Sequence, residues 1–148
     1  MNNQNISIHQ IIGIIIEKIN TNGKVIIKVT GNSMYPFYID KETEVVLVKP
    51  PKILHRKDVV LYKNPDGIWS LHRIIKVKKD CLLICGDALQ KIEHISQDSI
   101  VAIVKEHYHN NKLISNKLSH RIKVSLWLLF KPFRRYLLAI LRKLRKKQ

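Results

Sequence analysis

Ser33 and His72 are the residues of this chain whose types could form a nucleophile and its base. Ser33 stands in the stretch Gly31-Asn32-Ser33-Met34-Tyr35-Pro36-Phe37. A serine hydroxyl is a weak nucleophile at neutral pH, so it needs a base within hydrogen-bond reach. The ordinary pKa of a histidine suits that role, and His72 is the histidine placed inside a predicted strand. Either residue alone has a simpler interpretation, a serine in a turn or a histidine hydrogen-bonded at a sheet surface.

A base of this kind usually has a carboxylate on its far ring nitrogen. That carboxylate fixes the tautomer of the imidazole and stabilises the imidazolium that forms during the reaction. Asp87 and Glu93, which both follow His72 along the chain, are the candidates for this role. The residues by themselves leave the choice between them open.

The elements that must position these side chains are short strands. Apolar runs bounded by turn residues predict strands over residues 24–29, 44–48, 58–62, 68–77, 81–85 and 99–104. Asn64-Pro65-Asp66-Gly67 is a strong turn signal and joins two of these strands into a hairpin. Alternation along the second arm puts Trp69 and Leu71 on one face and His72 on the other. We therefore predict a mostly β fold.

Helical periodicity flanks these strands on both sides. Residues 7–19, within an N-terminal segment 1–23, repeat isoleucine at helical spacing and are expected to pack on the sheet. The catalytic β-domain would span residues 24–106, and the polar stretch 107–116 reads as a linker. Helical spacing then returns in an amphipathic C-terminal helix, whose apolar stripe is Ile122, Leu126, Leu129, Phe133, Leu137, Ile140 and Leu144. Pro132 should bend or restart this helix, which completes a third segment, 107–148.

The charge of the chain is concentrated in that third segment. The net charge is +16, and no acidic residue follows Glu106, whereas twelve of the 27 basic residues do. A leucine-rich stripe with basic flanks is typical of a helix that lies in a membrane interface. The expected membrane-surface residues are Trp127, Arg134, Arg135, Arg142 and Lys143.

A basic C-terminal segment can also have other roles. Spanning the bilayer is not expected, because Lys131, Arg134 and Arg135 would lie within the membrane. The helix could instead dock on the β-domain or on a partner protein. Nucleic-acid binding is not expected, since no DNA-reading or RNA-reading motif accompanies the charge.

Four short segments together resemble a known family, the type I signal peptidases and self-cleaving repressors. Gly31 to Phe37 resembles the Ser-Met-x-Pro box of that superfamily, and Lys57-Asp58-Val59-Val60 is similar to its Gly-Asp-Val-Val strand. His72-Arg73-Ile74-Ile75 resembles the His-Arg-Val box of the histidine-type signal peptidases, and Gly86-Asp87-Ala88 the Gly-Asp-Asn box. The four segments occur in the family's order and cover about residues 24–104. The resemblance implies the β-fold of this superfamily.

The resemblance also implies a serine endopeptidase with Ser33 as nucleophile and His72 as general base. In the histidine-type family the catalytic acid lies six residues after the box aspartate, a position that Glu93 occupies here. Asp87, the box aspartate, competes for the orienting role. The residues expected to contact substrate are Gly31, Asn32, Met34 and Pro36.

Gly31 departs from many signal peptidases, which have a serine two residues before the nucleophile. Stabilisation of the oxyanion would then rest on backbone N–H groups around Ser33. The family's transmembrane anchor has no counterpart before the serine, where the chain has only the isoleucine-rich segment. The N-terminus also lacks the basic region and cleavage site of a signal peptide.

The expected substrate is an extended signal or leader peptide, and the expected location is peripheral, on the cytoplasmic side of an anionic membrane. The alternative is a catalytically inactive family member that works as a membrane-surface or peptide-binding module. No cofactor or metal is expected. Cys81 and Cys85 fall inside a predicted strand, and His107 and His109 fall in a polar stretch, so a zinc site built from them is a weak alternative.

Overall fold

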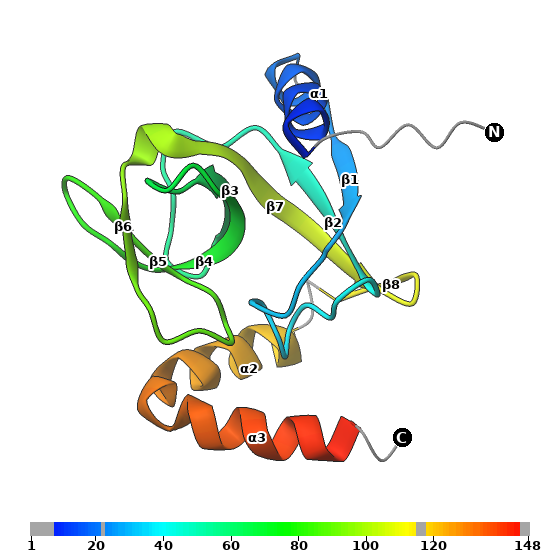
Figure 1. Ribbon diagram of the computed structural model, residues 1–148, viewed down its shortest axis with the longest axis vertical. Coiled ribbons are helices and arrows are strands. Elements are labelled where there is room, and N and C mark those ends of the chain that lie inside the picture. Colours follow the sequence, from blue (N-terminus) through cyan, green and yellow to red (C-terminus); the bar gives the residue numbers. More distant parts are fainter. Residues whose placement is uncertain (1–7, 22, 115–117, 146–148) are drawn as a thin grey trace.

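The computed structural model describes residues 8–21, 23–114 and 118–145. One α-helix precedes the strands and two α-helices follow them (Figure 1). In sequence they are α1 (Ile8–Asn20), β1 (Val25–Lys28), β2 (Thr43–Val48), β3 (Val59–Lys63), β4 (Trp69–Val77), β5 (Leu82–Cys85), β6 (Glu93–Ile95), the short helix η1 (Gln97–Ser99), β7 (Ile100–His109), β8 (Lys112–Leu113), α2 (Leu118–Leu129), η2 (Lys131–Phe133) and α3 (Arg134–Arg145).

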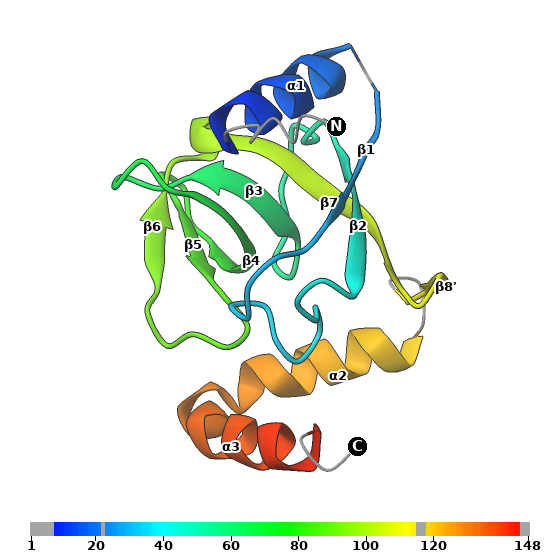
Figure 2. The ribbon, with the colours of Figure 1, turned by 45° about the vertical axis from the view of Figure 1, so that its right-hand side comes forward.

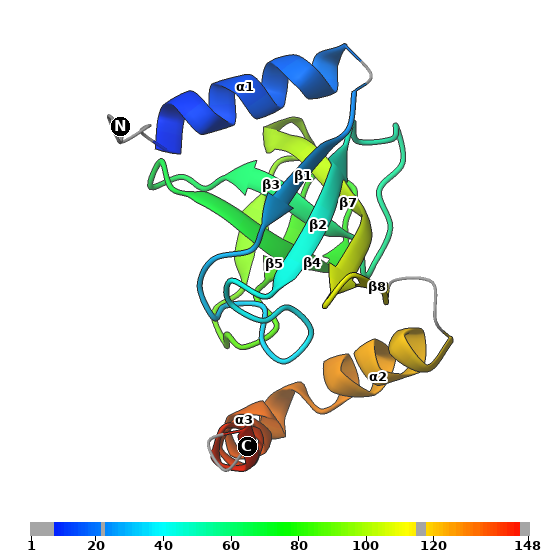
Figure 3. The same cartoon turned by 90° about the vertical axis from the view of Figure 1, so that its right-hand side faces the viewer.

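All pairs of neighbouring strands are antiparallel, and the strands join into one sheet. Its order is β1-β2-β7-β3-β4-β5-β6, with β8 paired to β7. The predicted mostly β fold is therefore confirmed. Helix α1 lies at one end of the sheet, and α2 and α3 lie at the other end (Figures 1 and 3).

The sheet has a separate hydrophobic cluster on each face. The first cluster gathers side chains of α1, β1, β2 and β3, including Leu47, Val59 and Leu61. The second gathers side chains of β3, β4 and β5, including Val60, Tyr62 and Ile74. Strand β3 thus contributes alternate residues to both clusters, as a strand buried on both faces must.

The predicted alternation in β4 is confirmed for its first half. Trp69 and Leu71 pack against the first cluster and Ile74 belongs to the second. His72 pairs with Val60 of β3 and therefore shares the face of the second cluster. A β-bulge opposite β5, between Ile74 and Lys76, ends the regular alternation.

Helix α1 covers the first cluster. Ile12, Ile15 and Ile19 are buried, and Ile11 and Ile14 are exposed on the other side of the helix. Figure 3 shows α1 lying across the end of the sheet beside β1 and β3. The isoleucine periodicity thus predicted both the helix and its packing on the sheet.

The prediction of a linker in the second half of the chain was wrong. Residues 107–113 are not a linker, because β7 continues to His109 and turns into β8. Strand β2 pairs along this extension, with Thr43 opposite His109 and Val45 opposite His107. Strand pairing and the burial of the His107 side chain order a stretch whose composition is polar. Strand β6, only three residues long, was also not predicted.

The C-terminal helix restarts at Pro132, as predicted. α2 ends at Leu129, η2 contains Pro132, and α3 follows directly. The predicted apolar stripe faces solvent for most of its length. We define the exposed apolar face as the large apolar side chains between residues 118 and 144 that are 46% to 71% exposed: Leu118, Ile122, Leu126, Leu129, Phe130, Phe133, Tyr136, Ile140 and Leu144.

A different side of the two helices packs against the β-domain. Val124, Trp127 and Leu128 of α2 and Leu138 of α3 are buried. Figure 2 shows both helices beneath the loops that follow β1 and β5. None of the helices in the described parts of the chain combines the length and the apolar character that crossing a bilayer requires.

Candidate active site

Ser33 lies in a tight loop that follows β1. Gly31 opens this loop with φ of 86°, a conformation that favours glycine, and its N–H donates to Oδ1 of Asp40 at 2.8 Å. The carbonyl oxygen of Met34 accepts hydrogen bonds from the N–H groups of Phe37 and Tyr38 at 3.1 and 3.0 Å. Because the Met34 side chain is only 1% exposed, it anchors the loop in the first cluster. Ser33 precedes this anchor and is half-buried.

The turn after β5 lies directly against Ser33. The N–H of Ala88 donates to the carbonyl oxygen of Ser33 at 2.8 Å. A Cβ atom on Gly86 would come within 2.7 Å of the same oxygen, so no larger residue fits there without movement. The serine loop and the Gly86-Asp87-Ala88 turn are therefore neighbours in space, although more than fifty residues separate them in sequence.

His72 is held through its Nδ1 atom. The hydroxyl oxygen of Tyr62 lies 2.9 Å from Nδ1, and the same hydroxyl donates its proton to Oε2 of Glu93 in a short hydrogen bond. Nδ1 of His72 lies 3.5 Å from Oε2 of Glu93. Tyr62 of β3 and Glu93 of β6 thus meet His72 of β4, and Tyr62 belongs to the second cluster.

This arrangement fixes the tautomer of the imidazole. A tyrosine hydroxyl has one proton, and Tyr62 gives it to Glu93, so the hydrogen bond to His72 requires Nδ1 to be the donor. Nε2 then carries the lone pair. Among the described residues, Nε2 makes no hydrogen bond that would occupy it, which is the state a general base needs.

Burial and nearby charge both shift the pKa of His72. Burial lowers the pKa of His72 below its ordinary value, against the opposing charge of Glu93, so the imidazole is neutral near pH 7. Burial by itself would raise the pKa of Glu93, but the hydrogen bond from Tyr62 and the charge of His72 outweigh it and lower that pKa. Burial and the bond to Glu93 raise the pKa of Tyr62, which stays protonated.

Asp87 has another partner. Both its carboxylate oxygens accept hydrogen bonds from Arg73, at 2.9 Å from Nε to Oδ1 and 2.7 Å from Nη2 to Oδ2. Asp87 is 1% exposed and Arg73 is 4% exposed. Of the two carboxylates left open by the sequence, Glu93 lies beside His72 and Asp87 forms a buried ion pair.

The Arg73–Asp87 ion pair connects the segments that carry His72 and Ser33. Arg73 follows His72 directly, and Ala88, which follows Asp87, holds the main chain of Ser33. The described residues show no hydrogen bond between the Ser33 hydroxyl and His72. Attack by Ser33 therefore requires that this hydrogen bond form in the complex with substrate.

The expected substrate-contacting residues divide into two groups. Gly31 and Asn32 are exposed beside Ser33, and Pro36 is half-buried. Pro36 also lines an apolar pocket of about 520 Å³, together with Phe37 and side chains of α2. The side chain of Met34 is buried in the core, so only the main chain of this residue is left to contact a substrate.

The expected membrane-surface residues also divide. Arg135, Arg142 and Lys143 are exposed, as predicted. Trp127 and Arg134 are buried, so the prediction that they face a membrane is wrong. The indole N–H of Trp127 donates to the carbonyl oxygen of Asp87 at 2.9 Å.

Arg134 binds the same turn as Trp127. Its Nη1 donates to the carbonyl oxygens of Gly86 and Leu89, at 3.2 and 3.0 Å. The Trp127 ring meets the Phe37 ring edge to face, with centroids 6.0 Å apart. The two C-terminal helices therefore brace both loops of the candidate site.

No metal centre is built from the described residues, where no three histidine, cysteine, aspartate or glutamate side chains are arranged to hold an ion. Cys81 and Cys85 are free thiols.

Sequence reasoning missed Tyr62. The signal was present in the predicted hairpin. Val60 pairs with His72 across this hairpin, and Tyr62 lies two residues from Val60 on the same face of the strand.

No protein-family profile, curated protein or solved structure matches this chain.

Proposed function

We propose that this protein is a serine endopeptidase that cleaves an extended signal or leader peptide, with Ser33 as nucleophile and His72 as general base. The observation that carries the proposal is the hydrogen-bond chain from His72 through Tyr62 to Glu93. It sets the tautomer that a serine nucleophile needs from its base. A catalytic histidine has this same arrangement, with a carboxylate linked to Nδ1 and Nε2 left free.

In the proposed reaction, Oγ of Ser33 attacks the carbonyl carbon of the substrate and its proton passes to Nε2 of His72. Glu93 stabilises the resulting imidazolium through Tyr62. His72 then gives the proton to the leaving amine as the peptide bond breaks, which leaves an acyl group on Ser33. A water molecule activated by His72 hydrolyses this ester and restores the serine hydroxyl.

The oxyanion would be stabilised by backbone donors of the serine loop. The N–H of Gly31 is already bound to Asp40. The N–H groups of Ser33 and Met34 donate to no oxygen in the described structure, so we assign them to the oxyanion. Losing one donor of this kind typically costs about 2.7 to 4 kcal/mol of transition-state stabilisation.

The substrate would add to the sheet as an extended strand. β1 is an edge strand that pairs on one side with β2 and leads directly into the serine loop. The outer edge of such a strand offers backbone donors and acceptors to an extended peptide. A substrate bound in this way would have one of its peptide bonds next to Ser33.

The test is cleavage of a defined peptide mixture by the purified full chain. Wild-type protein should cut the mixture, with a shared residue preference before the cleaved bond, and Ser33→Ala and His72→Ala should not. Cleavage by Ser33→Ala at the wild-type rate would rule out the proposed nucleophile.

A second candidate function is a catalytically inactive module that binds a membrane surface or a peptide. It is favoured by the lack of a hydrogen bond between Ser33 and His72 in the described structure. Wild-type protein that binds peptides without cutting them would support this module over the peptidase.

Either function is compatible with peripheral binding to an anionic membrane, which we also propose. The exposed apolar face of α2 and α3 offers side chains for insertion between lipid headgroups. Arg135, Arg142 and Lys143 are exposed on the same pair of helices and would meet the anionic headgroups.

A further inference from the structure

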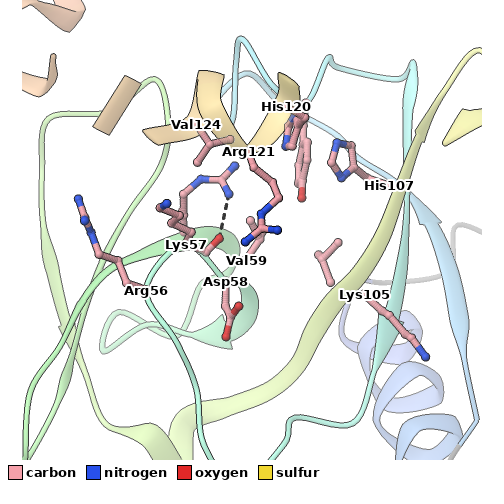
Figure 4. A pocket seen from close by; sticks show the side chains of 12 residues that line it. Arg56, Lys57, Asp58, Val59, Lys105, His107, His120, Arg121 and Val124 are labelled. Carbon is pink, nitrogen blue, oxygen red and sulfur yellow. Dashed lines mark hydrogen bonds between the residues drawn. The ribbon is translucent and has the colours of Figure 1, made fainter. Parts of the chain in front are cut away.

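A second pocket lies between α2 and the sheet, outside the proposed active site. Its volume is about 270 Å³, and neither Ser33, His72 nor Glu93 lines it. The sheet and its loops supply Lys57 and Arg73, and α2 supplies His120 and Arg121. Figure 4 shows Lys57 from one side and Arg121 from the other approaching the same space.

The pocket is strongly cationic. Five of its side chains carry positive charge: Arg56, Lys57, Arg73, Lys105 and Arg121. Arg73 pairs with Asp87, and the other four form no ion pair in the described structure. Nε of Arg56 donates to the carbonyl oxygen of Ile75, and Figure 4 shows Lys105 pointing away from α2. The one carboxylate in the lining is Asp58. Its Oδ2 accepts the N–H of His55, and Figure 4 shows the carboxylate pointing away from α2.

Arg73 adds a buried hydrogen-bond donor, held in a fixed position, to the lining of the pocket. Its Nε and Nη2 bind Asp87 and its Nη1 binds the carbonyl oxygen of Lys57 at 2.9 Å. A guanidinium has five N–H groups, so two remain for a ligand. Because Asp87 and the Lys57 carbonyl hold this guanidinium in place, little side-chain entropy is lost when it binds.

Two of the positive charges, Lys57 and Arg121, are carried by elements that meet within the chain. Nζ of Lys57 donates to Oγ of Ser125 on α2 at 2.8 Å, which brings its charge to the helix that carries Arg121. Like charges across such a contact weaken it. An anion between them would reverse that effect.

We propose that this pocket binds a phosphate group and that the bound phosphate holds α2 against the sheet. Arginine and lysine side chains that converge from separate elements are suited to a tetrahedral, multiply charged oxyanion. The volume admits a phosphate with a few further atoms. The group can come from a free phosphate compound or from a phospholipid headgroup, since α2 also carries part of the exposed apolar face.

Phosphate binding would also act on the proposed active site. α2 carries Trp127, which binds the carbonyl oxygen of Asp87 and packs against Phe37 of the serine loop. A ligand that fixes α2 therefore also fixes the two loops that meet at Ser33.

The experiment measures the affinity of the full chain for inorganic phosphate by calorimetry. Arg121→Gln and Lys57→Gln should each weaken binding at least tenfold, because each removes a charge-assisted contact. Lys123→Gln is the matched control, since it removes the same charge from α2 at a residue that does not line this pocket. Thermal unfolding without phosphate checks that each variant folds.

A second set of binding measurements tells whether the phosphate group belongs to a lipid or to a free compound. A short-chain phosphatidic acid that binds tenfold more tightly than inorganic phosphate, with the gain lost in Arg121→Gln, assigns the pocket to a lipid headgroup. Equal affinities assign it to a free phosphate compound. Phosphate should also slow hydrogen exchange of the α2 amides. No binding of either probe, or equal losses in Arg121→Gln and Lys123→Gln, would overturn the proposal.

Discussion

The hydroxyl oxygen of Tyr62 lies 2.9 Å from Nδ1 of His72, and the same hydroxyl donates a hydrogen bond to Glu93. The tyrosine thus stands between a histidine and a carboxylate that are themselves 3.5 Å apart, beyond ordinary hydrogen-bond length. This relation makes Tyr62 a positioning residue for the proposed base.

Tyr62→Phe should keep the fold and the base but lose the group that orients it. We expect kcat to fall roughly tenfold or more with little change in KM, because the tautomer of His72 is no longer fixed. Steady-state kinetics on a peptide identified in the cleavage test measures both constants. An unchanged kcat would show that Tyr62 serves only the core.

The two carboxylates provide the control for this prediction. Glu93→Gln should lower kcat and leave stability nearly intact, because Glu93 is only partly buried. Asp87→Asn should instead destabilise the fold by about 3 to 5 kcal/mol, since it leaves Arg73 buried without its partner charge. Urea unfolding separates the two outcomes. Equal effects on stability would contradict the assignment of their roles.

Much of this arrangement could be predicted from the sequence, and the part that could not depends on strand register. The strands around His72 and its face of the sheet follow from alternation of apolar residues and from the turn at residues 64–67. The contact with Tyr62 needs the exact register of β3 and β4. Glu93 reaches the same place through β6, a strand too short to show any periodicity.

The sequence also did not reveal which side of the C-terminal helices packs against the β-domain. The apolar stripe was expected to face a membrane, with docking on the β-domain as an alternative. η2 separates α2 from α3 and changes the direction of the chain between them. The side that packs is the one whose Trp127 and Arg134 bind the backbone of the turn after β5. Composition cannot reveal that an arginine is buried against carbonyl oxygens.

Acid should destabilise the fold through His107. Burial, and then the nearby charges of His120 and Arg73, lower the pKa of His107 to about 3. Below the unfolded value of about 6.5, the unfolded chain binds a proton that the folded chain does not, so stability falls as pH decreases. Between pH 6.5 and 5 this group alone should remove about 2 kcal/mol.

Urea unfolding at a series of pH values measures that slope. His107→Gln should flatten the curve between pH 6.5 and 5 and leave its course above pH 7 unchanged. The Tyr38 and His120 rings face His107. The pKa of His120 is also lowered, by burial first, so a smaller slope of the same sign should remain. A wild-type curve that is level over this range would contradict the burial of a neutral imidazole.

Docking of α2 should depend on Trp127. Trp127→Ala should cost about 3 to 5 kcal/mol of stability, the usual range for deleting a buried aromatic side chain. Trp127→Phe keeps most of the ring and loses the hydrogen bond to Asp87, which should cost about 1 kcal/mol. Leu129→Ala is the control on the same helix, because Leu129 is 71% exposed. Similar losses in Trp127→Ala and Leu129→Ala would refute the docked arrangement.

Membrane binding should depend on the exposed apolar face and on charge together. Phe133→Asp with Ile140→Asp should sharply reduce binding to phosphatidylcholine vesicles that contain phosphatidylserine. Ile53→Asp, at a residue of the β-domain that is 69% exposed, is the matched control and should bind as wild type. Sedimentation with vesicles measures binding, which should also fall steeply as salt increases. Binding that survives both substitutions would contradict the assignment of this face.

The proposed nucleophile can be tested most directly by locating the adduct of a serine-reactive fluorophosphonate probe. Mass spectrometry of digested wild-type protein should find the probe on Ser33, and labelling should disappear in Ser33→Ala and His72→Ala. Labelling should be slower in Tyr62→Phe and should rise with pH as His72 loses its proton. A wild-type protein that resists the probe, or an adduct on another residue that persists in Ser33→Ala, would contradict the assignment of Ser33 as an activated serine.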